Sequence, residues 1–212
     1  MSKMVLCITR TALAEQNIPR KANGIYPFDL SKVDSQDYHF INRKVVDAKD
    51  VDSHEHFIAS HLPQILPYIA VMDTDGKYLT YSRNGTETRL HGSRSIGIGG
   101  HVDIYDSYDT YNEEDTYWQS IEATILSAYR RELEEEILWH DYDDYLAVDF
   151  DKLIVDTSNP VGRVHVGLFT TLVYPQAQPQ EELHDPQWLT VEELKANIDE
   201  YENWSKLIIE GL

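Results

Sequence analysis

The sequence predicts an α+β fold, in which a sheet is combined with helices. Apolar, β-rich runs at 65–72 and 163–174 indicate strands, and residues 118–138 carry the longest helical pattern in the chain. The chain has 212 residues, of which 42% are hydrophobic, so it is long and apolar enough to bury one sizeable core.

The first 60 residues are expected to form an N-terminal extension that packs on a main domain at 61–212. Residues 5–8 read as a short strand and 38–46 as another. Residues 20–37 are rich in Gly, Pro, Asp and Ser, which predicts a loop, and 47–56 form a polar connection.

In the main domain, 65–72 and 77–82 flank the turn sequence Asp-Thr-Asp-Gly, which predicts a hairpin. A strand is expected within 89–102, where it ends in Gly-Ile-Gly-Gly-His. Residues 103–117 hold six acids and four tyrosines but one aliphatic residue. This composition cannot build a core element, so the segment is expected to be an exposed loop inserted into the domain.

The helix at 118–138 is expected to be buried at its start and to carry its carboxylates into a cleft at its end. Ile121, Ile125 and Ala128 share the face that later carries Glu132 and Glu136. Strands are expected at 152–156 and 163–174. Thr190 and Glu193 form a capping-box pattern, and a last helix ends near Gly211.

Carboxylates crowd at the end of the long helix. Glu132, Glu135 and Glu136 lie at i, i+3 and i+4, so they project from one helical face beside Arg131. Like charges at this spacing repel one another. The face is therefore either fully solvated or a site for a hard divalent cation such as Mg²⁺.

The composition excludes several classes of protein. A formal charge of −19 argues against nonspecific nucleic-acid binding, which relies on clustered Lys and Arg. The lone Cys7 excludes an internal disulfide framework and a cysteine-rich zinc site. No apolar run is long enough to span a membrane, and the N-terminus lacks a signal-peptide pattern, so a cytoplasmic protein is expected.

A glycine-ended strand, a loop and a helix with Arg-Glu-Leu-x-Glu-Glu resemble the Nudix box. The flanking segments 89–101, 130–136 and 162–167 are similar to a Nudix subgroup described as predicted phosphoesterases. The resemblance covers most of 60–200. It implies an α/β/α sandwich with a mixed central sheet.

The box departs from the family pattern in three places. Leu138 stands where a glycine is expected, and Ala123 where a glutamate is expected, although Glu122 is next to it. Gly100 lies 31 residues before Arg131 instead of 14, which indicates an insertion of about 17 residues. Either Glu122 or an acid of the insertion could replace the missing glutamate.

The resemblance implies hydrolysis of a pyrophosphate bond in a nucleoside diphosphate linked to another moiety, with Mg²⁺ or Mn²⁺. The metal ligands implied are Glu135 and Glu136, with Glu132 as a ligand or the base, the Gly100 carbonyl, and Glu122 in reserve. Arg131 is expected to orient a carboxylate. Candidate substrate contacts are Arg94, His101 and His165, each with a purely structural alternative.

Two other functions are kept as alternatives. The changes at Ala123 and Leu138 also fit a catalytically weak Nudix domain that binds a nucleotide as a sensor or regulatory module. An isomerase of the kind that acts on isopentenyl diphosphate is disfavoured, because it would need a cysteine in the site and Cys7 lies far outside the box. The partner expected is a small nucleotide-type substrate, without a membrane, and the resemblance allows a homodimer.

Overall fold

The structure, a computed structural model, describes residues 3–47, 52–83, 92–107, 120–138, 149–181 and 183–212. The chain forms two compact units that interleave along the sequence. The first unit comprises 1–67, 100–129 and 150–168, and the second comprises 68–99, 130–149 and 169–212. Strand β4 (Gln64–Met72), strand β9 (His165–Val173) and helix α4 (Ile121–Ile137) contribute residues to both units.

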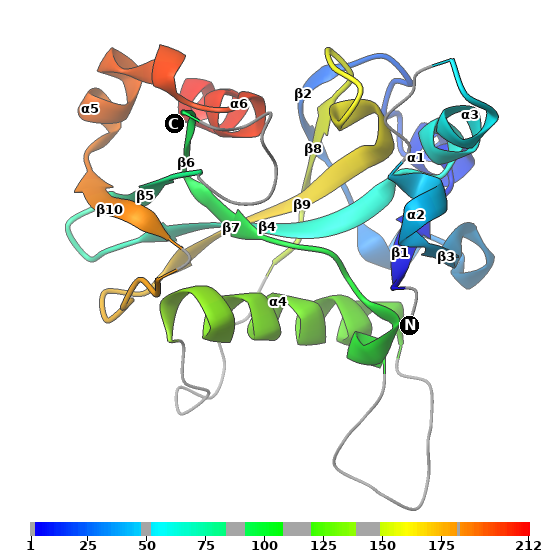
Figure 1. The fold of residues 1–212 in the computed structure, drawn as a ribbon, viewed down its shortest axis with the longest axis horizontal. Helices are drawn as coiled ribbons and strands as arrows, with labels where there is room; N and C mark the ends of the chain where they lie inside the picture. Colours follow the sequence, from blue (N-terminus) through cyan, green and yellow to red (C-terminus); the bar gives the residue numbers. More distant parts are fainter. Residues whose placement is uncertain (1–2, 48–51, 84–91, 108–119, 139–148, 182) are drawn as a thin grey trace, which may run out of the picture. The chain divides into compact units, whose positions relative to one another are not determined.

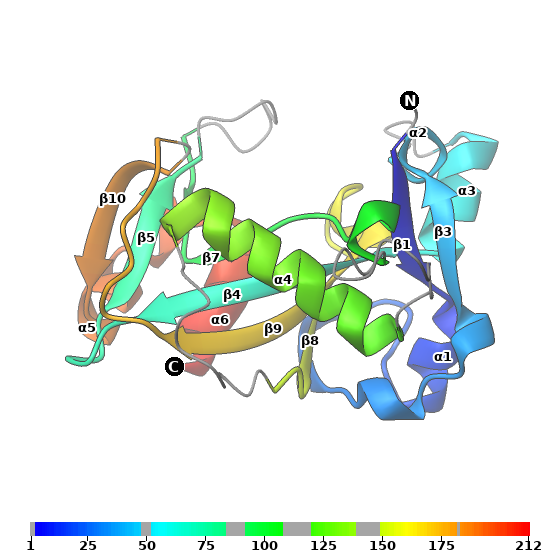
Figure 2. The same ribbon diagram turned by 90° about the horizontal axis from the view of Figure 1, so that it is seen from below.

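The first unit is built on two antiparallel strand pairs. β1 (Met4–Ile8) pairs with β3 (Tyr38–Asn42), and the two lie side by side (Figure 2). β2 (Asn23–Pro27) pairs with β8 (Lys152–Asp156). β1 also meets β4 at the Cys7–Gln64 pair and forms an isolated bridge from Val5 to Asp103.

Short helices accompany the strands of this unit. They are α1 (Arg10–Glu15), α2 (Arg43–Val46) and α3 (His54–His61), with 3-10 turns at Leu30–Lys32, Ser35–Asp37, Ile104–Ser107 and Gly162–Val164. Side chains of the first half of α4, such as Ile125 and Ala128, join Leu6, Leu153 and Val166 in one buried apolar cluster. Burial of this cluster is the main force that holds the unit together.

The second unit contains the strands around the predicted hairpin. β5 (Tyr78–Ser82) pairs with β10 (His184–Leu189), β6 (Arg94–Ser95) and the end of β4. β7 (Gly97–Gly99) pairs with β4. Helices α5 (Val191–Ala196) and α6 (Asn203–Gly211) follow, with a 3-10 turn at Ile198–Glu200 between them. α6 and the C-terminal half of α4 lie on opposite sides of these strands (Figure 1).

A buried polar cluster anchors α6 to β4 within the second unit. The Tyr68 hydroxyl donates to Glu202 Oε1 at 2.6 Å and lies within 3.1 Å of the hydroxyls of Ser95 and Ser205. Gly97 is required beside it, because a Cβ there would lie 1.9 Å from the Tyr68 ring. Its small size therefore lets β7 approach β4.

Most predicted elements are present, and the α+β class is confirmed. The strands expected at 5–8, 65–72, 77–82, 152–156 and 163–174 correspond to β1, β4, β5, β8 and β9, and the capping box at Thr190 is formed. None of the helices in the described ranges is long and apolar enough to cross a membrane. The division of the chain at residue 60 stays a prediction.

The first 60 residues contain more structure than the sequence predicted. The stretch 20–37 was expected to be a loop, but 23–27 form β2, because Ile25 and Tyr26 pair with Ile154 and Leu153 of a strand that lies far away in the sequence. The strand expected at 38–46 ends at Asn42, whose side chain accepts from the Lys44 N–H and so starts α2. β10 was also missed, because its residues are mostly exposed.

The acidic, tyrosine-rich segment begins differently from the expected exposed loop. Residues 104–107 form a 3-10 turn in which Asp106 and Ser107 are buried. Asp106 Oδ2 accepts from the Asp103 N–H at 2.7 Å, while Tyr105 is exposed. Residues 108–117 lie outside the described residues, and so does Trp118, where the long helix was expected to begin.

Candidate functional site

Helix α4 positions the predicted carboxylates. Ser120 starts it, since its hydroxyl accepts from the Ala123 N–H at 3.2 Å. Further along, Leu133 and Ile137 are fully buried in the second unit and fix the rotation of the helix. Glu132 lies next to this apolar stripe and is 8% exposed. A carboxylate is buried there only at a cost unless a cation or hydrogen-bond donors compensate for it.

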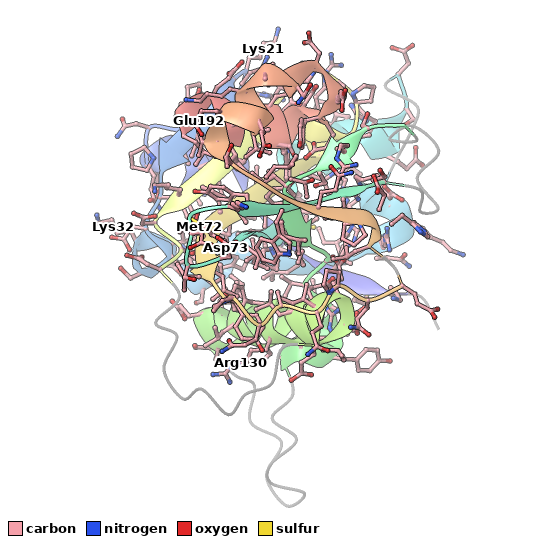
Figure 3. The ribbon with its side chains drawn as sticks, turned by 90° about the vertical axis from the view of Figure 1, so that its left-hand side faces the viewer. Lys21, Lys32, Met72, Asp73, Arg130 and Glu192 are labelled. Atoms are coloured by element: carbon pink, nitrogen blue, oxygen red, sulfur yellow. The ribbon has the colours of Figure 1, made fainter. Side chains whose placement is uncertain are left out.

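Arg131 supplies part of this compensation. Its Nη1 lies 2.6 Å from Glu132 Oε1 and 3.6 Å from Glu135 Oε2, so one guanidinium group serves two carboxylates. Glu135 is more than half exposed, whereas Glu132 is nearly covered. Arg130, one residue earlier, is exposed, and its side chain points away from the strands of this unit (Figure 3). The two adjacent arginines therefore have different environments.

Glu136, the third carboxylate, faces a group of buried side chains that the sequence did not indicate. Burial raises the pKa of Tyr81, and the negative charge of Glu136 raises it further. Burial alone would lower the pKa of Arg83, but Tyr81, Tyr68, Glu202 and Glu136 together outweigh it, so the pKa is raised. Glu136 thus shares its surroundings with a cation.

Arg83 could have been found from strand periodicity. Arg83 directly follows β5, and its N–H donates to the Ser93 carbonyl oxygen. If the extended backbone continues to Arg83, alternation places its side chain on the same side as that of Tyr81. The strand predicted at 77–82 ends at Ser82, and Arg83 was not among the predicted site residues. Arg83 is a further cation of the second unit, in addition to the predicted Arg94 and Arg131.

The end of α4 is closed without the expected glycine. Leu138 has a φ of 49°, the left-handed conformation that glycine adopts most easily. The carbonyl oxygens of Glu136 and Ile137 accept from the N–H groups of Gln180 and Gln178, at 2.9 and 3.1 Å. The loop before β10 therefore caps the helix and fixes the backbone beside Glu136.

Arg94 is engaged with strand β10 and its neighbours. Its Nη1 lies 2.7 Å from Asp185 Oδ2, and Nη2 donates to Asp185 O and Thr80 Oγ1 at 3.0 and 2.8 Å. The Arg94 hydrogen bonds hold the pKa of Asp185 below its ordinary value. These contacts give Arg94 a structural role, and its predicted contact with substrate stays a prediction.

The other predicted residues belong to the first unit. His165 is buried, and its Nδ1 lies 2.8 Å from the Val161 carbonyl oxygen, which can only accept, so Nδ1 carries a proton. His101 meets the His165 ring edge-on at a centroid distance of 5.8 Å. Gly100 lies just after β7, and Glu122 is exposed on the first turn of α4. The roles predicted for these four residues are not tested by these contacts.

The donor chemistry of α4 suits a hard cation. Carboxylate oxygens are the ligands that Mg²⁺ and Mn²⁺ prefer. In the described part of the chain, however, no group of three or more His, Cys, Asp or Glu side chains is arranged to hold a metal ion. A cation on α4 would therefore compete with Arg131 for Glu132 and Glu135 and draw their side chains together.

Comparisons with known proteins bear on the fold and the family. No protein-family model matches the chain. Protein YmaB of Bacillus subtilis (strain 168) is 31% identical over 157 residues, which cover 70% of this chain and 70% of that protein. The crystal structure of Tm1382, a candidate Nudix hydrolase, matches 98% of this chain and 97% of its own with a TM-score of 0.69 and 21% identity. A Nudix hydrolase from Alicyclobacillus acidocaldarius matches 70% of this chain and 90% of its own, with a TM-score of 0.46 and 14% identity.

Proposed function

Since the chain belongs to the family of protein YmaB and has the fold of a Nudix hydrolase, we propose that it is a pyrophosphohydrolase. Its substrate would be a nucleoside diphosphate linked to another moiety. The observation that carries the proposal is the set of carboxylates on α4, where Glu132 is nearly buried and held by Arg131. A nearly buried carboxylate beside two other carboxylates lowers the stability of the fold, so its presence indicates that the cluster has a function.

The reaction needs positive charge near the phosphate oxygens and a positioned water. Bound Mg²⁺ or Mn²⁺ would neutralise the oxygens of the pyrophosphate and lower the pKa of a bound water. Glu132, Glu135 and Glu136 would hold the metal ion. Arg131 orients Glu132 and Glu135 before the ion arrives. The helix cap from Gln178 and Gln180 keeps the end of the helix, and with it Glu136, in place.

The net negative charge of the protein affects how it could bind such a substrate. A substrate rich in phosphate would be repelled by a chain of net charge −19 unless cations shield it locally. Arg83 near Glu136 and the bound metal ion would supply that shielding. The proposal includes a cytoplasmic location, with which the lone cysteine, Cys7, is compatible.

The test compares Glu136→Gln with Glu134→Gln. Both variants remove one charge from the same helix, but Glu134 is exposed and lies off the shared carboxylate face. With Mg²⁺ or Mn²⁺, the intact protein is assayed against nucleoside triphosphates, ADP-ribose, nucleotide sugars, dinucleotides and dinucleoside polyphosphates. Glu136→Gln should lower hydrolysis of the best substrate by about 100-fold or more, and Glu134→Gln should leave it within about twofold. Full activity in Glu136→Gln would refute the metal-site assignment.

A nucleotide sensor without turnover is the second candidate. It is favoured by the arrangement of the described carboxylates, no three of which converge on a metal position. A sensor would bind a nucleotide saturably in the presence of Mg²⁺ or Mn²⁺ and release no product. Calorimetric binding together with product analysis by chromatography separates the two functions.

A further inference from the structure

The first unit contains a pair of arginines, Arg10 and Arg20, that the proposed hydrolysis does not use. Arg10, the first residue of α1, donates from Nε to the Ser60 carbonyl oxygen at 3.1 Å and from Nη2 to the Arg163 carbonyl oxygen at 3.0 Å. Arg20 Nη2 lies 2.8 Å from Nε2 of His61. Ser60 and His61 are consecutive, so both guanidinium groups contact the last turn of α3.

The contacts of His61 determine how it holds Arg20. Its Nδ1 lies 2.8 Å from the Phe57 carbonyl oxygen, which only accepts, so Nδ1 is the donor. Nε2 is then unprotonated and accepts a hydrogen bond from Arg20. The imidazole ring is therefore the neutral tautomer with its proton on Nδ1. Since Arg20 is exposed, His61 restrains a side chain that would otherwise move freely in water.

The positive charges here lack the partners expected in an acidic protein. The chain has 37 Asp and Glu residues against 18 Lys and Arg. Among the residues that the structure describes, neither Arg10 nor Arg20 forms an ion pair with a carboxylate. Burial and the charge of Arg20 lower the pKa of Arg10 to about 10. Within the described ranges, the two cations therefore act on each other without a carboxylate partner.

A purely structural role explains only part of this arrangement. Arg10 caps the C-terminal end of α3, where carbonyl oxygens lack helical partners and positive charge is favoured. The cap uses Nε, which donates to the Ser60 carbonyl oxygen, and Nη2 donates to the Arg163 carbonyl oxygen in the Gly162–Val164 turn. Arg10 Nη1 is buried without a hydrogen-bond partner. The cap also does not require Arg20, whose charge makes the placement of Arg10 less favourable. An anion between them would offset both costs.

We propose that Arg10 and Arg20, the latter held by His61, bind a phosphate group. Guanidinium N–H groups form charge-assisted hydrogen bonds with phosphate, and two guanidinium charges match a doubly charged group. Arg10 would donate from Nη1, because its Nε and Nη2 already bind carbonyl oxygens, and Arg20 would donate from the nitrogens not directed at His61. The phosphate could be free inorganic phosphate or the phosphate of a nucleotide. The site uses none of the residues assigned to pyrophosphate hydrolysis, so it would serve as an effector or product site.

The experiment follows the Nε–H resonances of Arg10 and Arg20 by NMR in the intact protein, with EDTA present. Inorganic phosphate, pyrophosphate and AMP are titrated separately. Both resonances should shift saturably with at least one of them. Similar affinity for phosphate and AMP would identify the phosphate group alone as the ligand, whereas much tighter binding of AMP would identify a nucleotide.

Arg20→Gln is the test variant and Lys21→Gln its matched control. Both remove one positive charge from neighbouring exposed positions, but no hydrogen bond joins Lys21 to Arg10 or His61 among the described contacts, and its side chain points outward (Figure 3). Arg20→Gln should weaken binding about tenfold or more, and Lys21→Gln less than about twofold. Equal losses in the two variants, or no saturable shift up to about 10 mM ligand, would overturn the proposal.

Discussion

At the scale of single residues, Leu138 shows how this chain closes a turn where glycine is the usual solution. Its backbone adopts a φ of 49°, which costs an L-residue about 1–2 kcal/mol. The side chain is 39% exposed, so burial of the leucine recovers only part of that cost. The carbonyl groups capped by Gln178 and Gln180 hold the backbone there.

The strain at Leu138 can be measured by comparing two truncations. Leu138→Ala and Leu138→Gly lose the same contacts, but only glycine relieves the backbone. The glycine variant should therefore be more stable than the alanine variant by about 1 kcal/mol in urea unfolding. Equal midpoints and slopes for both variants would mean that the backbone is not strained.

At the scale of elements, helix α4 depends on the pairing of Arg131 with Glu132. Replacing Arg131 by Met leaves a nearly buried carboxylate without this cation. Since the arginine is one-third exposed, the full cost of breaking a buried ion pair is discounted to about 1–2 kcal/mol. Urea unfolding should show this loss, while Arg130→Met, on the exposed side, should change stability by less than about 0.5 kcal/mol.

A double variant supplies the internal check on this pairing. Adding Glu132→Gln to Arg131→Met removes the nearly buried negative charge that Arg131 faced, so part of the lost stability should return. The stability lost through Glu132→Gln is measured in the wild type and in Arg131→Met. If the loss is the same in both, the two side chains do not interact.

The attachment of β10 to β5 and β6 should depend on pH through Asp185. Hydrogen bonds from Arg94 and Gln187 hold the folded-state pKa of Asp185 below its ordinary value of 3.8. A lowered pKa means that the carboxylate stabilises the fold above pH 3.8 and loses this contribution as the pH falls through the folded-state value. In Asp185→Asn, stability should therefore fall less steeply as the pH is lowered.

Asp185→Asn is a suitable variant because Asp185 has a φ of 47°, a conformation that asparagine also tolerates. Thermal unfolding between about pH 2 and pH 6 gives the profile. Asp199→Asn is the control, because Asp199 is not among the described hydrogen-bond and ion-pair partners of Arg94, and it should leave the slope unchanged. Identical slopes in all three proteins would show that the Asp185 contact contributes nothing to acid stability.

At the scale of the whole molecule, the charge of −19 opposes folding through self-repulsion. Monovalent salt screens this repulsion and should raise the melting temperature. Mg²⁺ should raise it further at matched ionic strength, because a ligand that binds only the folded state stabilises it. In Glu136→Gln the extra rise should shrink, while the effect of NaCl should persist.

A rise with Mg²⁺ that is the same in the wild type and in Glu136→Gln would indicate general screening. Glu134→Gln serves again as the charge-matched control. This measurement is independent of any substrate, so it tests the metal site even if no hydrolysed nucleotide is found.

Local patterns in the sequence determined much of this protein. Alternation and turn residues were sufficient to predict strands β4, β5 and β8. Helical periodicity predicted α4, and the capping box predicted the start of α5. Each of these patterns depends on neighbours a few residues apart. The same periodicity placed Glu132, Glu135 and Glu136 on one helix face. Sequence resemblance then supplied the fold.

Only the tertiary structure decided features that join distant segments. β2 exists because it pairs with β8, more than 120 residues away, and Arg83 joins the surroundings of Glu136 from the end of β5. Arg10 and Arg20 meet at α3 through Ser60 and His61. Such contacts depend on how strands pair and how segments pack, which no local pattern encodes. The carboxylates were therefore predictable from the sequence, whereas their neighbours were decided by the tertiary structure.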